Sequence, residues 1–189
     1  ALYYIDDIQV FDTVHAEETP AIAKGLKPND LPAFKTTSSL DGETADDALG
    51  FVYKNWVYAM IEHFDAYGWD VVNETFTENG QFRSKSNTTD DKSFIWGTYF
   101  GGQKNFVDKA FAYAKDALSL YGKTADLYIN DYNLETSPSK RKALCDYAAS
   151  NPDITGVGSQ MHLDMKTPDL QNKIVQMLKD MVATGKKVR

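Results

Sequence analysis

Apolar residues follow two alternating patterns along the chain from residue 41 to residue 189. In one pattern they recur every three or four positions, which is the spacing of an amphipathic helix. In the other they form short, nearly continuous runs, which are typical of strands covered on both faces. The first pattern predicts helices over residues 41–67, 103–120, 139–150 and 169–183, and the second predicts strands over residues 69–74, 126–130 and 154–160.

The order of these elements predicts the fold class. Helices and strands alternate, and such a run folds into right-handed βαβ units with a parallel sheet. Lys186–Arg189 follows the last predicted helix and looks like the first residues of a further strand. The 189 residues are fewer than the roughly 250 of a closed eight-stranded α/β barrel. We therefore expect an α/β fold with three parallel strands and helices on one side, as in the middle of a barrel.

The first and last predicted helices carry defined apolar stripes, and we expect both stripes to face the core. In the helix over residues 41–67 the stripe consists of Ala48, Leu49, Val52, Trp56, Ala59 and Met60. In the helix over residues 169–183 it consists of Leu170, Ile174, Met177, Leu178, Met181 and Val182.

The first 40 residues have a different character. Residues 1–11 alternate roughly between apolar and polar positions and predict a strand. Residues 12–40 are rich in Thr, Ala, Lys and Ser, and three prolines are spaced so that no long element fits. We divide the chain into a terminal strand at 1–13, a linker at 14–40 and an α/β region at 41–189.

Polar side chains stand where each predicted strand ends, and a polar loop over residues 75–92 follows the first strand. Because the carboxyl ends of parallel strands share one edge of a sheet, we expect these side chains to meet there, and polar groups at that edge often do chemistry. A loop of that length is usually functional or mobile. The side chains concerned are those of Asn73, Glu74, Asn130, Asp131, Tyr132, Gln160 and His162.

A structural role is the alternative for each of these residues. Glu74 could cap the loop that follows it, and His162 could be a hydrogen-bonded core histidine. Asp131 and Tyr132 could be turn and packing residues. Trp96 could stack on a sugar, although we favour packing in the core.

Composition and charge exclude several classes of partner. The net charge of −7 and the pI near 4.9 argue against nucleic acid and anionic membranes, and a neutral polymer is a better match. Cys145 is the only cysteine, so no disulfide forms within the chain, and we expect it to be a buried small hydrophobe. The sequence shows no metal-ligand spacing, and we expect no metal and no cofactor.

Three stretches, WDVVNE, LYINDYN and GVGSQMHLD, occur in this order with helices between them. Together they resemble the fourth, fifth and sixth strands of glycoside hydrolase family 10, the endo-1,4-β-xylanases. The resemblance covers roughly residues 41–189. It implies a partial (β/α)8 TIM barrel with about three parallel βα units, and it implies hydrolysis of internal β-1,4-xylosidic bonds of xylan with retention of configuration.

The resemblance also assigns roles to residues at the matching positions. Glu74 matches the general acid/base, and Asn73 matches the asparagine that holds the sugar 2-hydroxyl. Gln160 and His162 match residues beside the nucleophile. Two further residues match positions that line the cleft toward the leaving group, and these are Tyr132 and Asn130.

In that family the nucleophile lies on the seventh strand, after a stretch like Gly185–Arg189. We therefore expect this chain to be an internal piece of the enzyme that is inactive alone. The open barrel edges favour self-association. The family implies a secreted, periplasmic or cell-surface enzyme, and residues 1–11 resemble the closing strand of a β-sandwich carbohydrate-binding module.

Two other functions remain open from the residues alone. A non-catalytic carbohydrate-binding barrel would need no nucleophile. Another retaining barrel hydrolase, such as a cellulase or a mannanase, also carries Asn-Glu at its fourth strand. The motifs LYINDYN and QMH favour the xylanase family over these.

Overall fold

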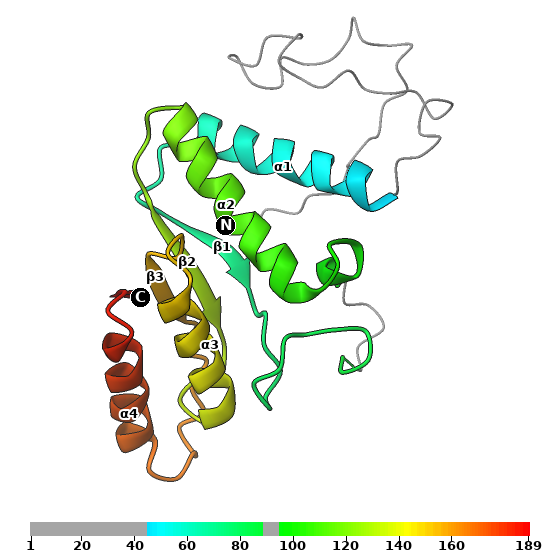
Figure 1. Cartoon of the computed structure of the whole chain (residues 1–189). Coiled ribbons are helices and arrows are strands. Elements are labelled where there is room, and N and C mark those ends of the chain that lie inside the picture. Colours follow the sequence, from blue (N-terminus) through cyan, green and yellow to red (C-terminus); the bar gives the residue numbers. More distant parts are fainter. Residues whose placement is uncertain (1–44, 89–94) are drawn as a thin grey trace, which may run out of the picture.

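The computed structural model describes residues 45–88 and 95–189 (Figure 1). The strand predicted for residues 1–13, the linker at 14–40 and the start of the first predicted helix lie outside the described residues. Within the described residues, helices and strands alternate as the apolar pattern predicts. The described part of the chain contains no helix that is long and apolar enough to cross a membrane.

The strands form one parallel sheet in the order β1-β2-β3-β4. This result confirms the predicted parallel α/β arrangement, and the sheet is open, as in part of a barrel. The further strand suggested by Lys186–Arg189 is present as β4. The bounds are Gly68–Asn73 for β1, Asp126–Asp131 for β2, Gly156–Ser159 for β3 and Lys187–Val188 for β4.

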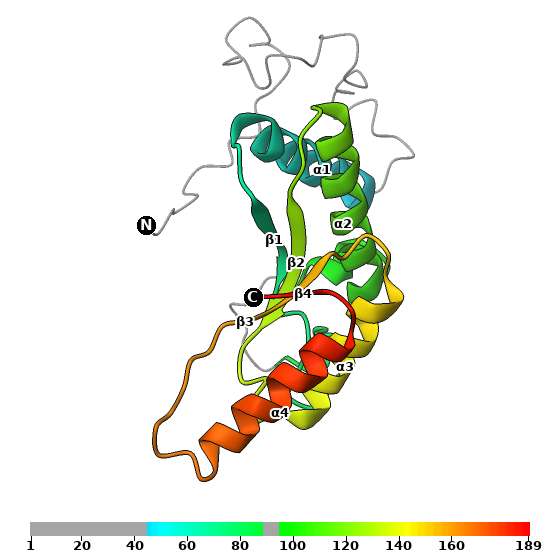
Figure 2. The same ribbon diagram turned by 90° about the vertical axis from the view of Figure 1, so that its left-hand side faces the viewer.

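The helices of the described residues lie along one face of this sheet (Figures 1 and 2). Leu127 and Ile129 of β2 and Val157 of β3 point to that face and are almost fully buried. The core fills the layer between the sheet and the helices. The bounds are Ala45–His63 for α1, Trp96–Tyr99 for the short 3-10 helix η3, Gln103–Leu120 for α2, Pro138–Ser150 for α3 and Leu170–Ala183 for α4.

The opposite face of the sheet is polar and ion-paired. The Lys187 ammonium of β4 lies 2.8 Å from Asp126 Oδ1 of β2, and Arg189 Nη1 lies 3.8 Å from Asp70 Oδ2 of β1. The Arg189 guanidinium also lies over the ring of Tyr128, 5.5 Å from its centroid. Gly156 leaves room for that ring, because a Cβ there would stand 2.2 Å from Tyr128.

Helix α1 differs from the sequence prediction in its packing face and in its end. Trp56 is 46% exposed, so the prediction that it belongs to the core-facing stripe is wrong. Tyr53 faces inward instead, because its ring packs against Trp96 and Phe106 at centroid distances of 5.0 and 5.3 Å. The helix ends at His63 rather than near residue 67. The Lys123 ammonium binds the backbone carbonyls of its last turn, which have no partner within the helix.

Helix α4 is also only partly buried. Met177 and Met181 are fully buried, as predicted, but Leu178 is 41% and Val182 is 63% exposed. The apolar stripe is therefore wider than the contact that α3 and the two-residue strand β4 provide.

The loop after β1 is less polar than its composition suggests. Phe76 is 2% exposed and its ring lies 4.7 Å from that of Phe82, to which it is joined by an antiparallel bridge. Gly80 brings the loop against α3, because a Cβ at this position would stand 2.6 Å from the carbonyl oxygen of Ser139. The described part of the loop, residues 75–88, is thus anchored on α3.

Candidate active site

The ends of β1, β2 and β3 meet at one edge of the sheet, as expected for parallel strands. The backbone N–H of Glu74 donates to the carbonyl oxygen of Asn130 at 2.9 Å, and that of Gln160 donates to the carbonyl oxygen of Asp131 at 3.1 Å. Glu74 and Met161 have φ values of 55° and 52°, in the left-handed region that non-glycine residues seldom adopt. The chain therefore bends sharply at two strand ends, and such strain is typical of functional sites.

Gln160 connects the polar side chains of all three strand ends. Its Nε2 atom lies 2.9 Å from Asn73 Oδ1, 2.9 Å from Glu74 Oε1 and 3.2 Å from Asn130 Oδ1. An amide nitrogen has two hydrogens, so the three acceptors share two donors. The partly buried Glu74 carboxylate is thereby held by the Gln160 amide, which also binds the side-chain amides of Asn73 and Asn130.

His162 extends this cluster toward solvent. Its Nε2 atom lies 3.0 Å from Gln160 Oε1, and its ring is exposed. Because a carbonyl oxygen accepts hydrogen bonds, the geometry favours the tautomer in which Nε2 carries the proton. Of the predicted site residues, Asn73, Glu74, Asn130, Gln160 and His162 are therefore brought together.

Tyr132 lies apart from this cluster and is connected to it through Arg83. The Arg83 guanidinium donates to the Tyr132 hydroxyl at 3.0 Å through Nη2 and to the Glu74 carbonyl oxygen at 2.8 Å through Nε. Tyr132 is therefore linked to the backbone of the candidate acid/base rather than to its carboxylate.

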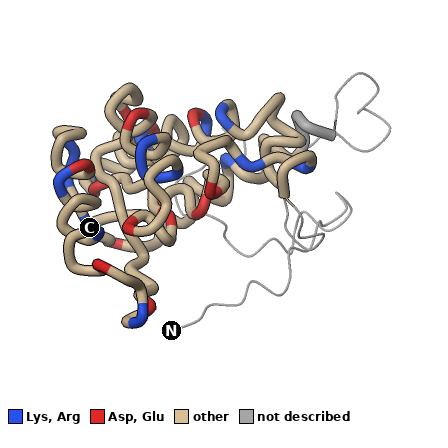
Figure 3. Tube along the Cα trace, turned by 90° about the horizontal axis from the view of Figure 1, so that it is seen from below, with Lys and Arg blue, Asp and Glu red and all other residues tan. Residues whose placement is uncertain are grey.

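A surface depression of about 510 Å³ adjoins the cluster. Asn73, Asn130, Gln160 and His162 line it, together with groups from the polar face of the sheet. Amide and imidazole groups at the strand ends offer the donors and acceptors that sugar hydroxyls require. Figure 3 shows basic and acidic residues interspersed along the trace of the described residues. This distribution of charge fits a neutral ligand.

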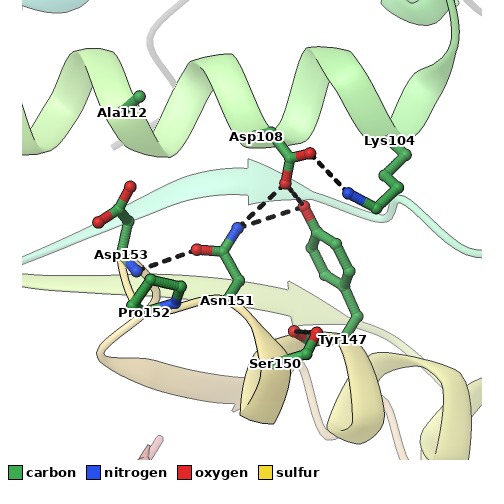
Figure 4. Close-up of a pocket in the computed structure, with 8 residues that line it drawn as sticks. All are labelled: Lys104, Asp108, Ala112, Tyr147, Ser150, Asn151, Pro152 and Asp153. Carbon is green, nitrogen blue, oxygen red and sulfur yellow. Dashed lines mark hydrogen bonds and ion pairs between the residues drawn. The ribbon is translucent and has the colours of Figure 1, made fainter.

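A second depression, of about 360 Å³, lies between α2 and α3 and contains none of the predicted site residues (Figure 4). Its polar groups bind one another: Tyr147 donates to Asp108 at 2.5 Å and Asn151 donates to it at 3.2 Å. Burial and the Asp108 carboxylate raise the pKa of the Tyr147 phenol well above its usual value. These contacts join two helices and suggest a structural role.

Sequence reasoning missed Arg83 and Lys140, and it left Asp131 undecided. Asp131 is fully buried and accepts hydrogen bonds from the backbone N–H groups of Phe76 and Tyr132 at 3.1 and 2.9 Å. The pKa of its carboxyl lies above the ordinary value, because burial raises this pKa by more than the Lys140 ammonium and the two N–H groups lower it. No sequence signal identifies Lys140, because it stands among polar residues at the start of a helix.

The described residues contain no group of three or more His, Cys, Asp or Glu side chains that could hold a metal ion. The acidic residue at the centre of the strand-end cluster is Glu74, and its neighbours there are neutral amides. The chemistry that this cluster offers is therefore proton transfer and binding of hydroxyl groups.

A family model described as "Glycosyl hydrolase family 10" matches residues 29–189. The chain belongs to glycosyl hydrolase family 10. Among curated relatives, an endo-1,4-β-xylanase of Agaricus bisporus is 31% identical over 144 residues, which are 70% of this chain and 36% of the relative. Endo-1,4-β-xylanase D of Talaromyces funiculosus is 30% identical over 156 residues, which are 79% of this chain and 34% of the relative.

Solved xylanase structures have the same fold. The endo-1,4-β-xylanase XylE of Penicillium canescens superposes with a TM-score of 0.63 at 27% identity, over 82% of this chain and 46% of the other. A xylanase of Bispora sp. MEY-1, solved with xylobiose, gives 0.62 at 28% identity with the same coverage. The chain thus spans less than half the length of these relatives, and its open sheet is part of a TIM barrel.

Proposed function

We propose that the chain forms the middle part of the catalytic domain of a retaining endo-1,4-β-xylanase, with Glu74 as general acid/base. The position of Glu74 carries the proposal. Its carboxylate stands at the carboxyl end of β1 in a cluster of amides, 2.9 Å from Gln160 Nε2. Family 10 membership and relatives named endo-1,4-β-xylanase support the substrate class.

Retaining cleavage needs two carboxyl groups about 5 to 5.5 Å apart. One protonates the departing oxygen and later activates water, and this role falls to Glu74. The other attacks the anomeric carbon. In the described strand-end cluster the Glu74 carboxylate meets amides, so we place the nucleophile at the carboxyl end of the strand that β4 begins, next to β3, where Gln160 and His162 would adjoin it.

We assign the remaining roles from the family 10 positions that these residues match. Asn73 and Gln160 present amides beside Glu74, where they would hold the sugar whose anomeric carbon reacts. Tyr132 matches the family position that lines the cleft toward the leaving group, and Arg83 connects its hydroxyl to the Glu74 carbonyl oxygen. The xylobiose bound in the Bispora structure supports an oligosaccharide as the ligand of this cleft.

We further propose that the enzyme acts outside the cytoplasm, since polymeric xylan cannot cross a membrane unaided. The open edges at β1 and β4 also favour pairing with another strand, either of the complete barrel or of a second copy. Size-exclusion chromatography of the 189-residue chain over a range of concentrations distinguishes a monomer from a self-associating species.

The test compares the complete protein that carries this chain with its Glu74→Gln variant on xylan, carboxymethyl cellulose and mannan. We expect the wild type to release xylo-oligosaccharides from xylan, and proton NMR should show that the first product keeps the β configuration. Binding of xylan without cleavage would instead identify a carbohydrate-binding barrel. Preference for cellulose or mannan would identify another retaining barrel hydrolase.

A further inference from the structure

Lys140, near the start of α3, is a fully buried lysine with four partners. Its ammonium lies 3.1 Å from Asp131 Oδ1 and 2.8 Å from Glu78 Oε1. It also lies 3.4 Å from the carbonyl oxygen of Tyr132 and 3.6 Å from the centroid of the Tyr132 ring. A buried ammonium is stable only when its charge is compensated, and here two carboxylates, a carbonyl and an aromatic face share it.

Asp131, the buried partner of Lys140, joins the two loops that carry the candidate site. Its Oδ2 atom accepts from the N–H of Phe76, two residues after Glu74, and its Oδ1 atom accepts from the N–H of Tyr132. Glu78, which also binds the Ser137 hydroxyl, ties the same first loop to the start of α3. The ammonium of Lys140 therefore stands where the loops after β1 and β2 meet.

The ring of Tyr132 lies near two cations. Lys140 contacts it at 3.6 Å from the centroid, and the Arg83 guanidinium carbon lies 5.8 Å from the centroid. Arg83 also binds the Tyr132 hydroxyl and the Glu74 carbonyl oxygen. A continuous series of contacts thus runs from Lys140 through Tyr132 and Arg83 to the backbone of Glu74.

We propose that Lys140 is a positioning residue that fixes the Tyr132 ring relative to Glu74 and so aligns the leaving-group part of the substrate. This inference rests on the proposed function. Lys140 itself does not touch substrate, since it is fully buried beneath Tyr132. Its charge holds the ring by a cation–π contact and, through Asp131, holds the two loops at a fixed separation.

An ion pair with a purely structural role would affect all substrates alike. A role in positioning Tyr132 affects chiefly those substrates that place a sugar on the leaving-group side. The two roles are therefore separated by comparing xylotetraose, whose leaving group is a sugar, with an aryl β-xylobioside, whose leaving group is a small aromatic ring.

The experiment uses Lys140→Met in the complete enzyme, because methionine fills a similar volume without the charge. Lys142→Met is the matched control, since Lys142 lies on the same helix with a side chain that is 75% exposed. We expect Lys140→Met to lower kcat/KM for xylotetraose by about 10- to 100-fold, the cost of a small misplacement of reacting groups. The value for the aryl xylobioside should fall by less than about threefold, and Lys142→Met should change neither.

Two additional variants distinguish the loss of positioning from misfolding and from effects that do not pass through Tyr132. Lys140→Met combined with Asp131→Asn removes both buried charges, and it should show the same substrate-dependent loss with a thermal unfolding temperature closer to wild type. Lys140→Met added to Tyr132→Ala should cause no further loss on xylotetraose, because the residue that Lys140 positions is already absent.

Equal losses on both substrates, or a Lys140→Met enzyme that matches wild type on xylotetraose, would overturn the positioning role. Either result leaves the proposed function intact, because wild-type cleavage and its dependence on Glu74 are measured in the same series. If the wild type cleaves neither substrate, or Glu74→Ala cleaves xylotetraose as wild type does, the proposed function fails and the role of Lys140 fails with it.

Discussion

Replacing Gln160 by leucine should impair catalysis far more than it affects folding. Gln160 Nε2 lies within 3.2 Å of three acceptors on two other strand ends, one of them the Glu74 carboxylate. With two hydrogens to donate, the amide makes one bond to the carboxylate and one to a neutral amide oxygen. A bond to a charged group is worth about 1.5–3 kcal/mol and a neutral bond about 0.5–1.5 kcal/mol, so the loss of both is about 2–4.5 kcal/mol.

If these bonds align the reacting groups, that loss corresponds to about a 30- to 2,000-fold fall in kcat/KM for xylo-oligosaccharides, at 1.36 kcal/mol per factor of ten. Gln160 is only partly buried, so the free energy of unfolding should change by less than about 1 kcal/mol. The control is Met165→Ala on the same loop, because Met165 is 83% exposed. Steady-state kinetics and urea unfolding of the complete enzyme supply both quantities.

A Gln160→Leu enzyme that keeps kcat/KM within about threefold of the wild type would contradict a role of Gln160 in aligning the reacting groups. A loss of activity that is matched by a loss of stability of the same size would also contradict it, because Gln160 would then be a structural residue. Met165→Ala should match the wild type in both measurements.

Three further predictions concern the framework around the site. Phe76→Ala should lower the free energy of unfolding, measured in urea titrations, by about 3–5 kcal/mol. Phe64 is 46% exposed, so Phe64→Ala should lower this free energy by less than about 1 kcal/mol. Burial raises the pKa of the Cys145 thiol from 9.0 to about 11, so the native protein should resist thiol reagents at pH 8. Because the unfolded thiol ionises first, up to about 2–3 kcal/mol of stability should be lost between about pH 9 and pH 11, and Cys145→Ala should abolish this loss. Gly80→Ala should destabilise the fold more than Gly122→Ala. Both glycines have positive φ, but a Cβ at Gly80 would stand 2.6 Å from the Ser139 carbonyl oxygen, whereas a Cβ at Gly122 would have nothing within 4 Å.

The sheet and the strand-end cluster could be predicted because their signals are local. Each strand is a short apolar run that ends in polar residues, and parallel strands present those ends at one edge. Asn73, Glu74 and Gln160 are therefore found from the pattern alone, although 86 residues separate Glu74 from Gln160 along the chain.

The parts that could not be predicted depend on tertiary contacts. Trp56 fits the apolar stripe of α1, but the aromatic cluster around Trp96 draws Tyr53 to the core instead. Lys140 stands among polar residues of α3 and would be read as a surface lysine. Only the packing of the β1 loop on α3, with Asp131 beneath it, buries this ammonium.

The dependence of the Glu74→Ala enzyme on the leaving group tests the catalytic role of Glu74 most directly. Loss of general acid catalysis costs typically 10²- to 10⁴-fold, or about 3 to 5 kcal/mol of barrier. In the complete enzyme, Glu74→Ala should lose xylan cleavage to about this extent. It should still form the glycosyl-enzyme from an activated aryl xyloside, whose leaving group needs no proton, and azide should restore the second step. Equal losses on both substrates with no response to azide would contradict the assignment of Glu74 as the acid/base.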